Sequence, residues 1–197
     1  MSKSNPSDSK KERNKTIRWV VTIFFVTIFV SGAISYMSDR LMGSSSMAVA
    51  FLILLLIVLV GIAFDIIGVA VTSADEKPFH SMAARKVPGS MEAIRLLRSA
   101  ERVSSICNDV IGDICGVVSG AASATIAAQV LQKFSFSLPQ LLTLAMSALV
   151  AGLTVGGKAL GKTFAINSCT QIVSGVGRMI YYLNFVKVLL SRKNKNS

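Results

Sequence analysis

The sequence has few charged residues, one histidine and three cysteines, and each shortage excludes a class of protein. Only 16% of the 197 residues are charged, whereas about a quarter are charged in an ordinary soluble domain. Because 52% of the residues are hydrophobic, a disordered chain is excluded as well. The cysteines are odd in number and form no CxxC pair, so neither a disulfide framework nor a zinc site is predicted. The sequence shows no catalytic triad, phosphate loop or dinucleotide fingerprint, so no enzyme is predicted.

Acidic residues are scarce compared with basic ones. The chain has 10 acidic and 21 basic residues and a net charge of +11. In a soluble protein this excess would indicate nucleic acid as a partner. Here the apolar residues occur in blocks long enough to cross a bilayer, which takes about 20 residues. We therefore predict the anionic inner surface of the plasma membrane as the partner, and no nucleic acid.

Four such blocks predict an all-α integral membrane protein. The predicted spans cover residues 17–37, 47–72, 103–131 and 138–157, and basic tails are expected at residues 1–16 and 191–197. With an even number of spans, both termini lie on the same side of the membrane. All basic residues except Arg40 and Lys133 then face that side, so the termini are predicted to be cytoplasmic.

Two further segments are predicted to lie at the cytoplasmic membrane surface. Residues 74–102 are too many for a simple connection, and Pro88 with Gly89 divides them into a helical hairpin. Residues 163–190 are apolar enough for a fifth span, but Arg178 would then lie near the middle of the bilayer. We therefore predict an interfacial helix there.

Three carboxylates inside the predicted spans are the strongest functional signal. A charged residue in the bilayer core costs at least about 2.5 kcal/mol on insertion scales, so it usually has a partner or a role. Asp65 lies in the second span, and Asp109 and Asp113 lie four residues apart in the third. Because the two spans run in opposite directions, all three fall about 9–15 Å from the cytoplasmic boundary. We expect them to converge.

Oxygen ligands in this region favour a hard cation such as Mg²⁺. The predicted ligands are Asp65, Ser73, Asn108, Asp109 and Asp113. The alternative is structural: the aspartates bond to serine, asparagine or backbone groups and fix the packing of the helices. No histidine or cysteine joins them at metal-ligand spacing, so zinc and copper are not expected.

Small residues form GxxxG ridges in the last two predicted spans. Gly112, Gly116 and Gly120 lie in the third span, and Gly152 and Gly156 lie in the fourth. This spacing predicts close helix packing in lipid, either within the chain or between two copies.

Residues 47–190 resemble the transmembrane domain of the CNNM/CorC family of Mg²⁺ transporters, including its CorB-like members. The resemblance rests on short motifs. Residues 67–73 stand in the place of a Ser-Glu-Thr-Ala-x-x-Ser type of motif, residues 107–109 in that of a Gly-Asn-Asn type, and residues 157–162 in that of a Gly-Glu-x-x-Pro-Lys type. A juxtamembrane hairpin and a closing amphipathic helix complete the likeness. The resemblance implies transport of Mg²⁺ or Co²⁺, a homodimer, and Asn108 as a ligand with Ser73 opposite.

The departures from the family pattern concern its carboxylates and its regulatory part. The family glutamates fall on Gly68 and Lys158, so either Asp65, Asp109 and Asp113 replace them or the lysine abolishes binding or serves as a built-in cation. The first span is additional, and the nucleotide-sensing CBS pair is lacking, so a separate regulatory subunit is a further expected partner. The predicted function is divalent-cation transport; the alternative is a non-transporting membrane subunit or regulator of the same fold.

Overall fold

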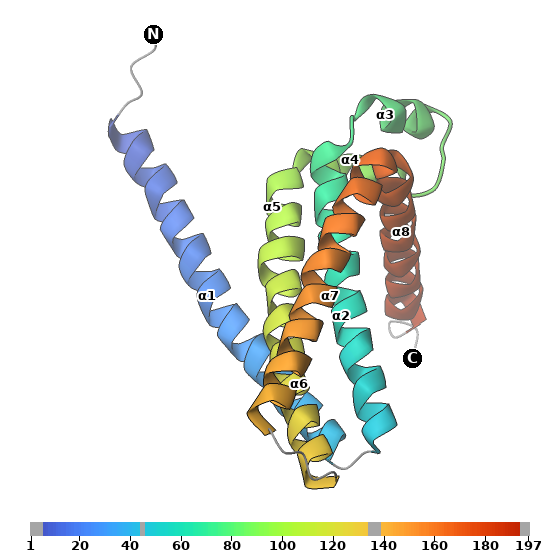
Figure 1. Ribbon diagram of the computed structural model, residues 1–197. Helices are drawn as coiled ribbons and strands as arrows, with labels where there is room; N and C mark the ends of the chain where they lie inside the picture. Colours follow the sequence, from blue (N-terminus) through green and yellow to red (C-terminus); the bar gives the residue numbers. More distant parts are fainter. Residues whose placement is uncertain (1–5, 44–45, 134–138, 194–197) are drawn as a thin grey trace.

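The computed structural model describes residues 6–43, 46–133 and 139–193, and the regular secondary structure in these ranges is entirely helical. The elements are α1 (Pro6–Gly43), α2 (Met47–Ser73), α3 (Lys77–Ala84), α4 (Ser90–Arg98), α5 (Ala100–Ser105), the π-helix η1 (Ile106–Gly112), α6 (Asp113–Lys133), α7 (Pro139–Asn167) and α8 (Cys169–Lys193). Helices α2 and α7 and the continuous helix α5–η1–α6 lie side by side, whereas α1 leans away (Figure 1). The predicted all-α class is confirmed.

Among the described residues, four helices are long and apolar enough to cross a membrane, as predicted. They are Ile17–Ser38, Met47–Ser73, Ala100–Lys133 and Pro139–Asn167. The last differs most from its prediction, because α7 continues past residue 157. The added turns contain no proline and carry apolar side chains around their two lysines, so nothing ends the helix earlier. Similarly, α1 begins at Pro6, so most of the expected 1–16 tail is helical, and residues 1–5 lie outside the described ranges.

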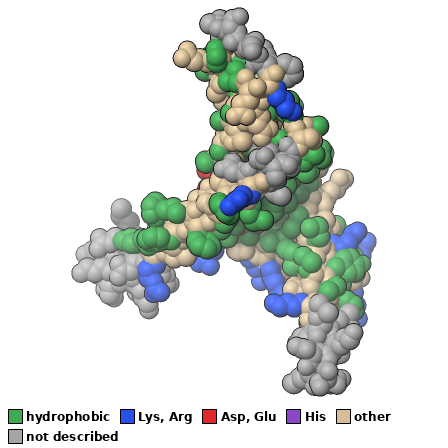
Figure 2. Space-filling model, turned by 90° about the horizontal axis from the view of Figure 1, so that it is seen from below, with side chains coloured by type: hydrophobic (Ala, Val, Ile, Leu, Met, Phe, Trp, Pro, Cys, Tyr) green, Lys and Arg blue, Asp and Glu red, His purple; other side chains and the backbone are tan. Residues whose placement is uncertain are grey.

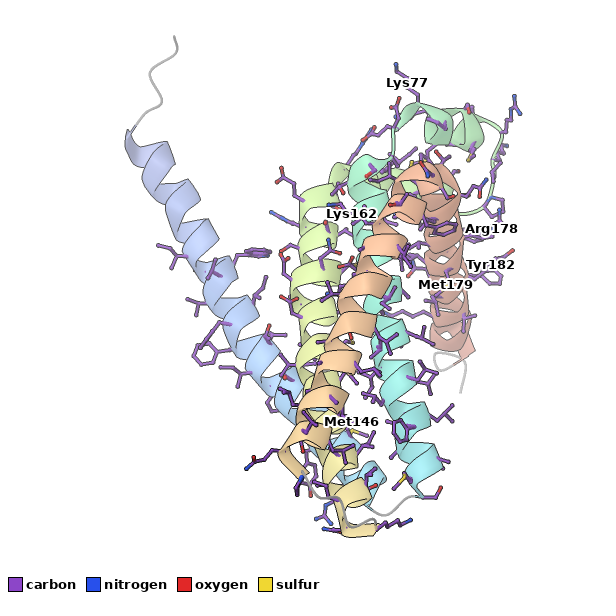
Figure 3. The ribbon with its side chains drawn as sticks, viewed as in Figure 1. Lys77, Met146, Lys162, Arg178, Met179 and Tyr182 are labelled. Atoms are coloured by element: carbon purple, nitrogen blue, oxygen red, sulfur yellow. The ribbon has the colours of Figure 1, made fainter. Side chains whose placement is uncertain are left out.

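Helix α8 follows a break at Ser168 and turns back from the end of α7 (Figure 1). It therefore begins later than the interfacial helix predicted for residues 163–190. Arg178, Met179 and Tyr182 lie along it (Figure 3). Its first half packs against α4 and α2, with Val173 fully buried, but every described side chain from Tyr181 to Lys187 is exposed. The predicted C-terminal tail is helical up to Lys193, and residues 194–197 lie outside the described ranges.

Short helices α3 and α4 lie on either side of Pro88 and Gly89 and contact each other, and the two helices are called the hairpin below. Phe79 of α3 is fully buried, and Ala93 and Ile94 of α4 join it in a core that includes Val71 of α2. This core lies at the end of the bundle where α2 ends and α5 begins (Figure 1). The hairpin therefore fixes the ends of the helices on either side of the candidate site.

Two glycines of α7 bring that helix close to α2. A Cβ added at Gly161 would lie 2.7 Å from Cγ1 of Ile66, and one at Gly157 would meet the side chain of Ile62. Each glycine therefore receives an isoleucine from the facing helix, at the four-residue spacing that gives close packing in lipid.

Of the five glycines in the ridges predicted from the sequence, Gly112 alone lies against side chains of other helices. A Cβ at Gly116, Gly120, Gly152 or Gly156 would meet no atom within 4 Å. Small residues of α6 and α7 instead border an open groove of about 210 Å³. Close packing within the chain is therefore observed at Gly112 but not at the other four glycines, and contact between two copies stays a prediction.

Large hydrophobic side chains cover much of the outer surface of the molecule. In the view from below, three arms spread from the centre and hydrophobic side chains are spread over them (Figure 2). In α1, for example, Phe25 is 64% exposed and Phe29 is 79% exposed. In water such a surface would favour aggregation, so it fits a protein surrounded by lipid.

Candidate functional site

The interface between α2 and η1 contains the polar residue Asn108, whose side-chain amide lies against Gly68 of α2. A Cβ at Gly68 of α2 would overlap Oδ1 of Asn108, so the side chain rests on the bare backbone of α2. The Nδ2 group of Asn108 donates to Oγ of Ser104 at 3.3 Å. Its Oδ1 atom is buried and accepts no hydrogen bond. A buried carbonyl oxygen without a donor is costly, and a cation is one group that could satisfy it.

Asp65 lies one helical turn below Gly68 and pairs with a lysine. Oδ1 of Asp65 is 3.7 Å from Nζ of Lys158 on α7. Only 17% of the Asp65 side chain and 24% of the Lys158 side chain are exposed. A Cβ at Gly112 of η1 would lie 3.9 Å from Oδ1 of Asp65 and 3.3 Å from Nζ of Lys158. Three helices therefore meet around this ion pair, within the membrane-spanning stretch.

The other two predicted carboxylates face away from α2. Asp109 and Asp113 are exposed, and Asp109 accepts a hydrogen bond of 2.6 Å from Oγ of Ser105. The reason is geometric: Asn108 and Gly112 form one stripe toward α2, and each aspartate follows one residue later, on the adjacent stripe of the helix. The expected convergence of Asp65 with this pair is therefore not observed.

Ser73 also lies apart from Asp65. It is the last residue of α2, is exposed, and follows Asp65 by about 12 Å along the helix axis. In the described ranges, no group of three or more His, Cys, Asp or Glu side chains could hold a metal ion. The candidate site thus consists of Asp65, Asn108 and Ser104, with Lys158 beside the carboxylate.

The backbone at the site is a π-helix rather than an α-helix. Helix η1 spans Ile106–Gly112 and interrupts an otherwise α-helical segment. Wide turns of this kind are rare and occur often at functional sites. The segment combines this rare backbone with the unpaired oxygen of Asn108.

Replacing Gly68 with alanine should displace the Asn108 amide. The added methyl group overlaps Oδ1 of Asn108, but the amide is the movable end of a side chain, so we expect a loss of only about 1–2 kcal/mol in unfolding free energy. The melting temperature in detergent measures this loss. Gly120→Ala is the matched control, because its methyl group would meet no atom within 4 Å and alanine favours the helix. A Gly68→Ala variant as stable as Gly120→Ala would contradict the packing described here.

The sequence-based prediction placed Lys158 outside the membrane, after a span that ended at residue 157. The apolar residues that follow it were the available signal that α7 continues. Lys158 lies nine residues before the end of α7, and Asp65 lies eight before the end of α2. The two residues therefore lie at nearly the same distance from the ends of their helices. A predicted fourth span extended to residue 167 would have indicated this agreement.

No protein-family model, curated protein or solved structure matches this chain.

Proposed function

We propose that the protein transports divalent cations of the Mg²⁺ or Co²⁺ type across the plasma membrane. The observation that carries the proposal is the buried Oδ1 atom of Asn108, which lacks a donor and lies against Gly68, a residue one helical turn along α2 from Asp65. Carboxylate, amide and hydroxyl oxygens suit Mg²⁺, which also retains several waters. Ionisable residues inside a membrane span commonly mark an ion pathway. The resemblance to CNNM/CorC transporters implies the same cargo.

The proposed arrangement places both termini, the hairpin and the start of α8 on the cytoplasmic side. The basic residues support this orientation: Lys77, Lys162 and Arg178 lie toward one end of the bundle, whereas Met146 lies toward the other (Figure 3). The open faces of Gly116, Gly120, Gly152 and Gly156 leave room for a second copy, in keeping with the proposed homodimer. A separate regulatory subunit stays part of the proposal.

Mg²⁺ uptake into proteoliposomes tests the function. Uptake with wild-type protein should exceed uptake by empty liposomes. The Asn108→Leu variant should reduce uptake about tenfold, because leucine is similar in size to asparagine but lacks the oxygen ligand. Asn184→Leu is the matched control, since Asn184 is exposed on α8. Uptake that is equal in wild type and Asn108→Leu would remove Asn108 from the site, and wild-type uptake no higher than in empty liposomes would overturn the function.

A second function is favoured by the Asp65–Lys158 pair. The lysine neutralises the carboxylate without any metal ion, as a purely structural pair would. The chain would then be a non-transporting subunit or regulator whose polar residues fix helix packing. This function predicts that Mg²⁺ leaves the melting temperature unchanged, whereas a transported ion that binds the native state raises it.

A further inference from the structure

The ammonium group of Lys158 lies where a cation beside Asp65 would lie. Gly157 and Gly161, its neighbours on α7, pack against isoleucines of α2, so the backbone of α7 comes close to Asp65. The lysine side chain needs only to turn along this interface to reach the carboxylate. The N–O distance of 3.7 Å exceeds that of a charge-assisted hydrogen bond, which is about 2.7–2.9 Å. The ammonium is therefore attracted to Asp65 but not locked to it.

Charge balance makes Lys158 and a divalent cation competitors for Asp65. The pair is neutral as a whole and mostly buried. Mg²⁺ added to the pair would leave two positive charges uncompensated in a region of low dielectric, where charges interact strongly. If the ammonium withdraws along its flexible stem, Asp65 is free for the cation.

We propose that Lys158 is a tethered cation that holds Asp65 in the empty site and must withdraw before Mg²⁺ binds. The inference rests on the proposed function and adds its regulation: Lys158 sets the Mg²⁺ concentration at which the site fills. A positive charge supplied by the chain keeps the intramembrane carboxylate paired while no ion is bound.

Mg²⁺ titration of the melting temperature, on purified full-length protein in detergent, tests the inference. Without Mg²⁺, Lys158→Met should melt at a lower temperature than wild type, because Asp65 loses its partner. Mg²⁺ should restore the melting temperature of this variant, with half-saturation at a concentration at least about tenfold lower than for wild type. Lys158→Arg, which keeps the charge, should saturate near wild type. Lys158→Gln is a second neutral variant in case Lys158→Met does not fold.

Asp65→Asn/Lys158→Met serves as the control that lacks both charges, and it should show no Mg²⁺ response. Equal half-saturation in wild type and Lys158→Met would overturn the inference and leave the proposed function standing. A response in Lys158→Met, together with no Mg²⁺ uptake by wild type, would overturn the proposed function while supporting competition by the lysine. Absence of a response in wild type and both neutral variants would overturn both.

Discussion

Replacing Asp65 with asparagine should abolish Mg²⁺ uptake and destabilise the protein. The variant removes the only charged ligand of the proposed site and leaves the Lys158 ammonium without its partner. We expect a loss of about 3 kcal/mol in unfolding free energy, at the lower end for breaking a buried pair, because both side chains keep some exposure. Uptake into proteoliposomes and chemical denaturation in detergent measure the two effects.

Asp113→Asn separates this site from the general effect of removing a carboxylate. Asp113 is exposed on α6 and lies on the stripe that faces away from α2. Its replacement should change stability by no more than about 0.5 kcal/mol. It should also leave Mg²⁺ uptake intact. Loss of uptake in Asp113→Asn but not in Asp65→Asn would place the ion pathway on the outer face of α6.

A methyl group at Gly177 should separate α8 from the hairpin. It would lie 2.5 Å from the carbonyl oxygen of Gly89 and 3.0 Å from the backbone nitrogen of Ala93. These are backbone atoms at the start of α4, and Gly89 itself has φ +86°, so this backbone segment cannot move aside easily. We expect Gly177→Ala to cost about 3 kcal/mol, near the upper end for overpacking. Hydrogen exchange of the α4 amides and the melting temperature both report the loss.

Gly175→Ala, in the same helix, should raise the free energy of unfolding, whereas Gly177→Ala lowers it. A Cβ at Gly175 would meet no atom within 4 Å, so alanine contributes only its better helix propensity, up to about 1 kcal/mol. Opposite changes in stability from the same substitution at two positions two residues apart cannot result from a general effect on α8. Equal melting temperatures for the two variants would show that α8 does not dock through Gly177.

The sequence predicts the membrane helices well because their signal is local. Each span is a continuous apolar block, and the hairpin is marked by Pro88 and Gly89, so neither depends on distant contacts. The end of α7 was missed because two lysines entered the span. A lysine is a stop signal when unpaired, but Lys158 is paired with Asp65 on another helix, which hydropathy alone does not register.

The site was predicted only in part, because contacts between helices decide which residues belong to it. Asp65 and Asn108 were identified from their residue types, and both lie toward neighbouring helices. Sequence spacing could show that Asp109 and Asp113 share a stripe, but not whether this stripe or the adjacent one, with Asn108 and Gly112, faces α2. Glycine decides it, because only the stripe with Gly112 leaves room for the side chains of Asp65 and Lys158.

The π-helix η1 has a consequence for motion. A wide turn holds a surplus residue, and that surplus can pass to the next turn without changing the length of the helix. Each residue that it passes rotates by about 100°, while the two ends of the helix stay in place. Such a shift across Asn108 would turn the amide away from α2 and bring Asp109 in its place. Exchange of the group that the helix presents to α2 would then need a rearrangement of only the seven residues of η1, without tilting of the bundle.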